Sequence, residues 1–396
     1  MEEKVGDNGI DRRNIFALGF TSLLTDISSE SVYAVLPLYI LHLGYGREVV
    51  GVVEGLGELA SSMFKLISGV VSQKIGRFKL LTAIGYSLSN FIKPLFAIAR
   101  TPLSISSIKF IDRVGKGIRT SPRDVLITQS SKYSVRGRAF GIHRTMDTIG
   151  ALIGPLTAFL ILPVLGYQGV FILSLVPGSL AILILALFVK ERIVQLDRIS
   201  IKHSVRPELF YLFLLTVVLT GLSGFNQAFL LIRARELGWS EQLVLTLLIL
   251  ANIIYSAIAY PIGRFFDIKI RNLLYPITHL SIIMGSIIAV IMNTPKAPLL
   301  FFTIYGLFLA LNDVSTRVIT SRIVSEKKAG VGFGLMHMSL GLSVLTGNTL
   351  LGFIYEKLGY RSAFTYSAVI GLAGLVSSTI FVLLVTRREF SENIRF

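Results

Sequence analysis

The sequence predicts an all-α membrane protein of twelve transmembrane helices, arranged as two pseudo-symmetric bundles of six. Three observations lead to this prediction: the composition, the spacing of long apolar segments, and an internal repeat. Of 396 residues, 53% are apolar and 16% are charged, whereas about a quarter of an average soluble domain is charged. A chain with so few charges must expose apolar side chains to lipid, so we expect the bilayer to be its main partner.

Long apolar segments follow one another along the chain. A helix needs about 20 apolar residues to cross a bilayer, and backbone groups in hydrocarbon must satisfy their own hydrogen bonds, which favours helices. The first segment is too long for a cleavable signal peptide and carries Asp26 and Glu30 near its middle. The predicted spans are 15–42, 48–73, 79–99, 103–128, 137–163, 168–189, 208–236, 241–264, 272–293, 299–323, 330–356 and 362–386.

The net charge of +16 follows the topology of these spans. Basic residues concentrate at the N-terminus and in every second connection, which predicts that both termini are cytoplasmic and that the protein is a multi-pass protein of the plasma membrane. They are not interleaved with stacking aromatics in a soluble segment, so no nucleic-acid partner is expected. The residues are Lys4, Arg12, Arg13, Lys74, Arg77, Lys79, Lys132, Arg136, Arg138, Lys190 to Arg206, Arg264, Lys269, Arg271, Arg322, Lys327, Lys328, Arg387, Arg388 and Arg395.

An internal repeat relates the two halves in the same order and at nearly constant spacing. Leu43-Gly44 recurs as Leu237-Gly238, and Leu165-Gly166-Tyr167 recurs as Leu358-Gly359-Tyr360. The segment between the halves is charged and contains a proline. We therefore predict an N-terminal six-helix bundle at 1–189, a cytoplasmic linker at 190–207 and a C-terminal six-helix bundle at 208–396.

Three motifs carry a resemblance to a known family. The first is the loop GVVSQKIGRFK (Gly69 to Lys79), with a second copy at Gly263, Arg264 and Asp267. The others are Arg113-Val-Gly-Lys-Gly117 and Gly150-x-x-x-Gly154-Pro155. On these motifs the chain resembles the major facilitator superfamily over nearly its whole length. The resemblance implies the fold of that family and the function of a secondary transporter. The resemblance also implies a set of gating residues, namely Gly69, Lys74, Gly76, Arg77, Gly150, Gly154, Pro155, Gly263 and Asp267.

The glycines of the third motif have two interpretations. Small residues four positions apart let two helix backbones approach closely, which is a packing role. A proline beside them bends the helix, and such a bend would bias the halves toward an export cycle.

Charged residues inside the predicted spans are shared unequally by the two halves. A charged residue at the centre of a span costs at least about 2.5 kcal/mol. Several first-half charges are neutral at the repeat positions, so the common scaffold does not require them. The pairs are Asp26 with Thr220, Glu30 with Gly224, Glu54 with Leu248, Glu58 with Asn252, and Lys65 with Ala259, while Arg119 and Arg123 correspond to Asp313 and Arg317.

Helical spacing indicates which charges meet. Asp26 and Glu30 share one face of the first span, with Tyr33 continuing it. On the fourth span Asp112, Lys116, Arg119 and Arg123 form one stripe. If the first and fourth spans line a central cavity, as the resemblance implies, the two carboxylates face the cations.

Two interpretations of these charges stay open. In one, they form a self-neutralising salt-bridge network that stabilises the first half. In the other, a carboxylate pair that shares a desolvated face binds and releases a proton in each cycle. The second interpretation assigns proton coupling to Asp26, Glu30, Glu58 and Arg113. It assigns the substrate cavity to Tyr33, Lys116, Arg119, Arg123, Asn226, Gln227, Asp313 and Arg317.

Other chemistry finds no support in the sequence. The chain has no cysteine, its histidines lack metal-ligand spacing, and no phosphate-binding glycine loop follows a strand. We expect no cofactor, no metal and no enzymatic activity. The predicted function is a monomeric, proton-coupled exporter of an unidentified small molecule, working by alternating access. The alternatives are a symporter that imports an organic anion, and an uncoupled lipid or solute facilitator or receptor.

Overall fold

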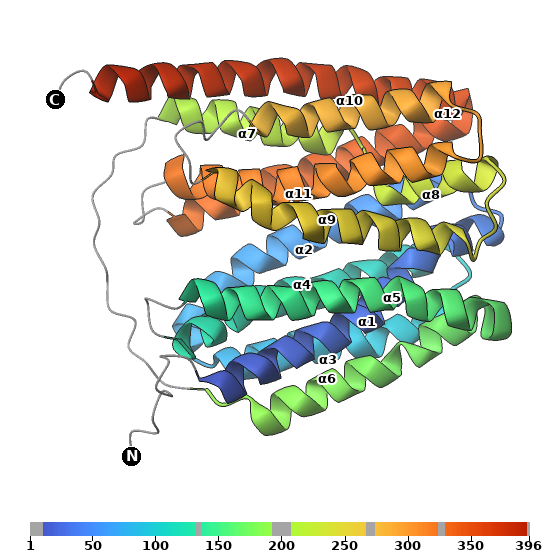
Figure 1. The fold of residues 1–396 in the computed structure, drawn as a ribbon. Coiled ribbons are helices and arrows are strands. Elements are labelled where there is room, and N and C mark those ends of the chain that lie inside the picture. The colour runs from blue at the N-terminus through green and yellow to red at the C-terminus, as the bar shows by residue number, and fades with distance from the viewer. Residues whose placement is uncertain (1–10, 132–135, 192–206, 267–273, 324–328, 394–396) are drawn as a thin grey trace. The chain divides into compact units, whose positions relative to one another are not determined.

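The computed structural model describes residues 11–131, 136–191, 207–266, 274–323 and 329–393. In these ranges the chain forms helices and no β-strand (Figure 1), so the prediction of an all-α protein is confirmed. The elements are α1 (Arg12–His42), α2 (Arg47–Ile75), α3 (Phe78–Ile92), the 3-10 turn η1 (Lys93–Ala97), α4 (Pro102–Gln129), α5 (Arg136–Leu173), α6 (Leu175–Phe188), α7 (Pro207–Leu222), α8 (Gln227–Glu236), α9 (Val244–Phe266), α10 (Tyr275–Ile291), α11 (Ala297–Ile323) and α12 (Ala329–Asn393).

Two compact units make up the chain. Unit 1 comprises Met1–Gly44 and Leu56–Asp197, and unit 2 comprises Tyr45–Gly55 and Arg198–Phe396. The first turns of α2 therefore belong to unit 2, and the rest of α2 belongs to unit 1. The predicted division at the linker stays a prediction, because most of that linker lies outside the described residues.

Local sequence sets several helix ends. Asp11 caps α1, since its Oδ1 accepts a hydrogen bond from the Asn14 amide at 3.1 Å. At the start of α4, Thr101 and Ser104 form a reciprocal capping box around Pro102 at the first helical position. Gly76 ends α2 in a left-handed conformation with φ 67°, which suits a residue without a side chain.

Glycines also break the long helices. Non-helical backbone at Gly166 divides α5, and non-helical backbone at Gly359 divides α12. Both breaks lie between predicted spans. The predicted span 208–236 differs, because it is interrupted between α7 and α8, where Gly224 has φ 63°. The stretch Glu208–Glu236 as a whole is still long and apolar enough to cross a membrane, and apolar character alone does not reveal a backbone that turns at a glycine.

Four stretches of described helix are long and apolar enough to cross a membrane. The charged residues within α1, α2 and α4 lower the apolar character of those helices. The count of twelve spans stays a prediction. The four stretches are Ala139–Phe188, Glu208–Glu236, Ala297–Thr320 and Gly334–Thr386, and shorter apolar helices are Val244–Ala259 and Tyr275–Ile291.

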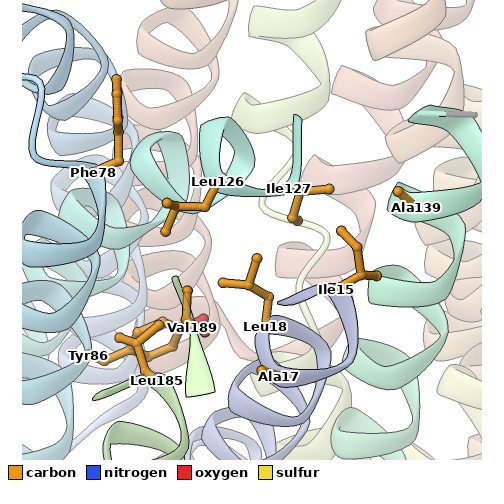
Figure 2. Close-up of a cluster of buried hydrophobic side chains, with 10 residues drawn as sticks. All are labelled: Ile15, Ala17, Leu18, Phe78, Tyr86, Leu126, Ile127, Ala139, Leu185 and Val189. Atoms are coloured by element: carbon orange, nitrogen blue, oxygen red, sulfur yellow. The ribbon is translucent and has the colours of Figure 1, made fainter. Parts of the chain in front are cut away.

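Within unit 1, α1 packs against α5 and α6, and α3 packs against α4 (Figure 1). One apolar cluster joins the ends of several of these helices, and Figure 2 shows Tyr86 of α3 beside Leu185 and Val189. Large apolar side chains also point outward, among them Leu103 and Val164, which are 77% and 79% exposed. Exposed apolar surface of this kind suits contact with lipid.

Within unit 2, α7 packs against α12, α9 packs against α11, and α10 packs against both α11 and α12. Phe213 of α7, Tyr275 of α10 and Phe381 of α12 are fully or almost fully buried in one cluster. Their rings lie 5.9 to 6.2 Å apart, a spacing at which aromatic pairs attract.

Candidate functional site

The contact between α1 and α5 positions the acidic pair of unit 1. A methyl group built on Gly154 would lie 2.6 Å from Glu30 Cβ, and one built on Gly150 would lie 3.0 Å from Asp26 Cβ. A methyl group on Gly150 would also collide with the backbone oxygen of Leu23. The two glycines thus let α1 approach α5 at the residues that carry the carboxylates, and Pro155 follows them inside α5.

Asp112 of α4 is the centre of a buried polar cluster in unit 1. Tyr33 of α1 donates its hydroxyl to one carboxylate oxygen, and Ser89 of α3 donates to the other at 2.5 Å. The positive charges of Lys93 and Arg113 also act on this carboxylate. A carboxylate with no exposed surface therefore has both oxygens hydrogen-bonded and two cations to balance it.

The ring of Tyr33 is covered by two cations from α4. Lys109 Nζ lies 3.9 Å from the ring centroid, and the guanidinium carbon of Arg113 lies 4.1 Å from it. These distances are within the range of cation–π attraction. The structure thus brings together Tyr33 and Arg113, which the sequence analysis assigned to the cavity and to coupling respectively.

Charges of both signs act on the carboxylate of Asp26. The carboxylates of Asp147 and Glu30 repel it, while Lys116 and Arg119 of α4 attract it. Lys93 of η1, which is fully buried and donates to Ser29 Oγ at 3.1 Å, also interacts with Asp26 and Glu30. The predicted opposition of the acidic pair to the cations of α4 is therefore present in unit 1.

Other charges of unit 1 form local pairs. Asp147 accepts from Arg144 at 2.8 Å and from Ser22 at 2.6 Å. Arg123, predicted to line the cavity, pairs with its neighbour Asp124 at 3.0 Å. These pairs suit the structural interpretation of the buried charges.

The remaining predicted residues of unit 1 do not join the acidic pair or the Asp112 cluster in the contacts described. Glu58 accepts from Ser62 at 3.4 Å, Gly69 lies 3.5 Å or more from Ser121, measured from the position of a built methyl group, and Arg77 is exposed. The side chain of Lys74 lies outside the described residues, as do, in unit 2, the surroundings of Gly263 and all of Asp267.

In unit 2, neutral hydrogen bonds form at the repeat counterpart of Asp26, which is Thr220, and one helical turn before it. Thr216 and Tyr275 share a hydrogen bond of 2.5 Å, and Thr220 and His279 share one of 3.0 Å. All four residues are buried.

Three residues of unit 2 that were predicted to line the cavity form an ion pair or cap a helix. Asp313 and Arg317 form an ion pair of 2.8 Å along α11, and Tyr255 donates to Asp313 at 3.0 Å. Asn226 caps α8 by accepting from the Ala228 amide at 2.9 Å, and Gln227 is the first residue of that helix.

A second charge cluster lies in unit 2, around Arg47 at the start of α2. Its guanidinium donates to Glu236 at 2.8 Å and to Glu356 at 3.1 Å. Tyr355 donates to Glu236 at 2.8 Å, and its ring lies 5.2 Å from the Arg47 guanidinium. The sequence analysis missed this cluster, because its members lie far apart in sequence and no motif joins them.

Sequence reasoning also missed Ser89, Tyr86 and the central place of Asp112. The spacing of Asp112 from Lys116 was the available signal, and it placed Asp112 on the charged stripe without showing its partners. Among the described residues, no group of His, Asp and Glu side chains could hold a metal ion.

Comparison with known proteins places the chain in a family. The sequence profile of the Major Facilitator Superfamily matches residues 18–305 and 212–395. The chain belongs to the major facilitator superfamily. It is therefore a multi-pass membrane transporter rather than an enzyme.

Similar sequences include an uncharacterised transporter and a multidrug resistance protein. An uncharacterised MFS-type transporter of Methanocaldococcus jannaschii is 30% identical over 373 residues, which cover 91% of this chain and 92% of the relative. A multidrug resistance protein of Escherichia coli is 25% identical over 165 residues, which cover 40% of each chain.

Solved transporters share the fold. A nucleoside transporter has a TM-score of 0.75 at 15% identity, covering 93% of this chain and 99% of that chain. A transporter of the POT family, solved with 5-aminolevulinic acid, has a TM-score of 0.76 at 13% identity, covering 95% and 96%. The predicted major facilitator fold is therefore confirmed.

Proposed function

We propose that this transporter is a proton-coupled exporter of a small molecule, in which Asp26 and Glu30 bind the coupling proton. The halves alternate access to a site near the middle of the membrane, and the chain works as a monomer in the plasma membrane. Glu58 and Arg113 belong to the same proton pathway in this proposal.

The observation that carries the proposal is the placement of the acidic pair. Asp26 and Glu30 lie on the face of α1 that packs on Gly150 and Gly154, and Lys116 and Arg119 act on Asp26 from α4. A carboxylate between a like charge and opposite charges can exchange a proton when a small movement changes those distances.

The repeat supports a functional reason for the pair. Thr220 and Gly224 stand at the corresponding positions of the second half, and Thr220 is satisfied there by His279. A scaffold that folds with a threonine and a glycine does not need two carboxylates at this depth. The partial match to an Escherichia coli multidrug resistance protein supports the direction of transport.

The glycine motif belongs to the proposed cycle. Gly150 and Gly154 allow close contact with α1, and Pro155 removes one backbone donor from α5. Movement along this contact would change the surroundings of Asp26 and Glu30, which couples proton binding to the conformational change. The other proposed gating positions are Gly69, Lys74, Gly76, Arg77, Gly263 and Asp267.

A second candidate function is proton-coupled import of an organic anion. The observation that favours it is the set of cations on α4, in particular Arg119, which is 3% exposed and lacks hydrogen-bond partners for Nε and Nη1. An uncoupled facilitator would leave the acidic pair without a role.

Flux measurements separate these functions. The protein is reconstituted in liposomes that contain a pH-sensitive dye, and compounds from a chemical library are added on either side. An exporter moves protons opposite to the compound, a symporter moves them with it, and a facilitator moves none. Substrate flux that is unchanged by collapse of the pH gradient would refute the proposed coupling.

The proposed orientation has its own test. Both termini are cytoplasmic if the basic connections lie inside. A cysteine introduced at Lys296, in a chain that has none, should react with an impermeant reagent on intact cells, and one introduced at Arg198 should not. The reverse pattern would invert the topology.

A further inference from the structure

Two buried polar side chains of unit 1 contact each other and lack hydrogen-bond partners. Tyr86 of α3 is 1% exposed and Arg119 of α4 is 3% exposed. The Tyr86 hydroxyl and the Arg119 Nε and Nη1 have no acceptor or donor within reach. The guanidinium lies over the Tyr86 ring, 4.5 Å from its centroid. Buried polar groups are normally hydrogen-bonded, so three such atoms at one contact need an explanation.

The backbone around this pair is held closely. A methyl group built on Gly85 would lie 2.7 Å from the Arg119 amide nitrogen, and one built on Gly115 would lie 2.7 Å from the Gly85 oxygen. The two helices, α3 and α4, therefore pack closely through these glycines beside Arg119 and Tyr86. This close packing fixes where the guanidinium lies.

The nearby carboxylates do not serve Arg119 as hydrogen-bond acceptors. Asp112 accepts from Tyr33 and Ser89, and Asp124 accepts from Arg123. Asp26 interacts with Arg119 only through its charge.

In the second half, the residue that corresponds to Arg119 has a charged partner. The repeat counterpart of Arg119 is Asp313, which forms an ion pair of 2.8 Å with Arg317. In the first half an arginine replaces the acid, so the pairing along the helix is lost, and Arg123 turns to Asp124 instead.

Guanidinium N–H groups and a phenolic hydroxyl are the donors that an oxyanion accepts best. The positive charges of Lys116 and Lys93 act on the same region, together with Asp26. We propose that Arg119 and Tyr86 bind the carboxylate or phosphate group of the transported solute, which makes the substrate an organic anion. The inference rests on the proposed transport function but does not depend on the direction of transport or on the coupling ion.

Equilibrium binding tests this assignment without a gradient, so it is independent of proton coupling. The full chain is placed in phosphatidylcholine nanodiscs, and its melting temperature is titrated with inorganic phosphate, acetate, benzoate and the neutral benzamide. At least one of the three anions should stabilise the protein, and benzamide should not. Stabilisation by none of the anions, or equal stabilisation by benzamide and benzoate, would overturn the proposal.

Variants locate the site. Arg119→Gln should weaken binding of the stabilising anion by about tenfold or more, since it removes a charge-assisted contact. Tyr86→Phe keeps the ring under the guanidinium and should weaken binding by a few-fold, about the effect of one neutral hydrogen bond. Arg235→Gln, which removes a paired and 36% exposed arginine of the second half, is the matched control and should not change the affinity. Unchanged affinity in Arg119→Gln, or equal loss in the control, would contradict the site.

An anionic lipid headgroup could supply the same chemistry. If the site holds a lipid, phosphatidylglycerol nanodiscs should stabilise the wild type but not Arg119→Gln, and the soluble anions should not compete. That result would overturn the assignment to a transported solute. Stabilisation by the soluble anion in both kinds of nanodisc is the expected result.

Discussion

The two units share a repeated sequence but differ in the polar side chains buried inside them. Unit 1 surrounds Asp112 with Tyr33, Ser89 and two cations, and it sets Asp26 and Glu30 against the cations of α4. Unit 2 uses the neutral pairs Thr216 with Tyr275 and Thr220 with His279. Thr220 and Gly224 stand in the second half where the first has Asp26 and Glu30, so the scaffold that the two units share does not require this pair of carboxylates.

The backbone contacts differ much less between the units. Gly154 packs on Glu30 and Ser31 in unit 1, and its repeat counterpart Gly347 packs on the backbone oxygens of Gly221 and Leu222 in unit 2. Close glycine contact is therefore shared by the two halves, and the acidic pair Asp26 and Glu30 together with the buried Asp112 distinguishes the first half.

The largest expected effect comes from Asp112→Leu. The change leaves Lys93 and Arg113 without their buried counter-charge, so the free energy of unfolding should fall by about 3 to 5 kcal/mol. Unfolding in mixed micelles measures the loss. Asp124→Leu is the control, because Asp124 is 45% exposed in its pair with Arg123 and should contribute at most about 1 kcal/mol. Equal losses in the two variants would mean that the buried carboxylate of Asp112 contributes no more to stability than the exposed carboxylate of Asp124.

A smaller effect is expected at the shared glycine contacts. Gly154→Ala and Gly347→Ala should each lower the unfolding free energy by about 1 to 3 kcal/mol, since the added methyl group would collide with Glu30 Cβ in the first case and with the Gly221 backbone oxygen in the second. Gly141→Ala is the control within α5, where no atom lies within 4 Å of the added methyl group. Melting of the three variants in detergent gives the comparison. A stable Gly154→Ala beside a damaged Gly347→Ala would show that the close contact is not shared.

The smallest effect is expected from Thr220→Val in unit 2. The substitution keeps the shape and removes one neutral hydrogen bond to His279, which should lower the free energy of unfolding by about 1 kcal/mol. Transport should be unaffected, because no charge of unit 1 changes. A loss of gradient-driven flux in this variant would show that the neutral pair of unit 2 also takes part in coupling.

The sequence predicted the all-α class, the family fold and the electrostatic attraction between Asp26 and the cations of α4. Those features follow from apolar length, repeat and helical spacing, which are local or periodic signals. The break at Gly224 was not predicted, because a glycine at positive φ leaves no mark in apolar content. The partners of Asp112 and the unpartnered contact of Arg119 with Tyr86 were also missed, since both depend on how α1, α3 and α4 pack.

Asp26 and Glu30 are the proposed proton-binding pair, and one set of variants tests this role most directly. Asp26→Asn and Glu30→Gln keep shape and hydrogen bonding but fix the neutral state. In proteoliposomes, gradient-driven flux measured at several pH values should collapse, while exchange without a gradient survives in at least one variant. Melting temperatures measured alongside, with Arg113→Gln added to each variant, identify any loss that comes only from an unpaired cation. Full gradient-driven transport by both single variants would contradict the coupling assignment.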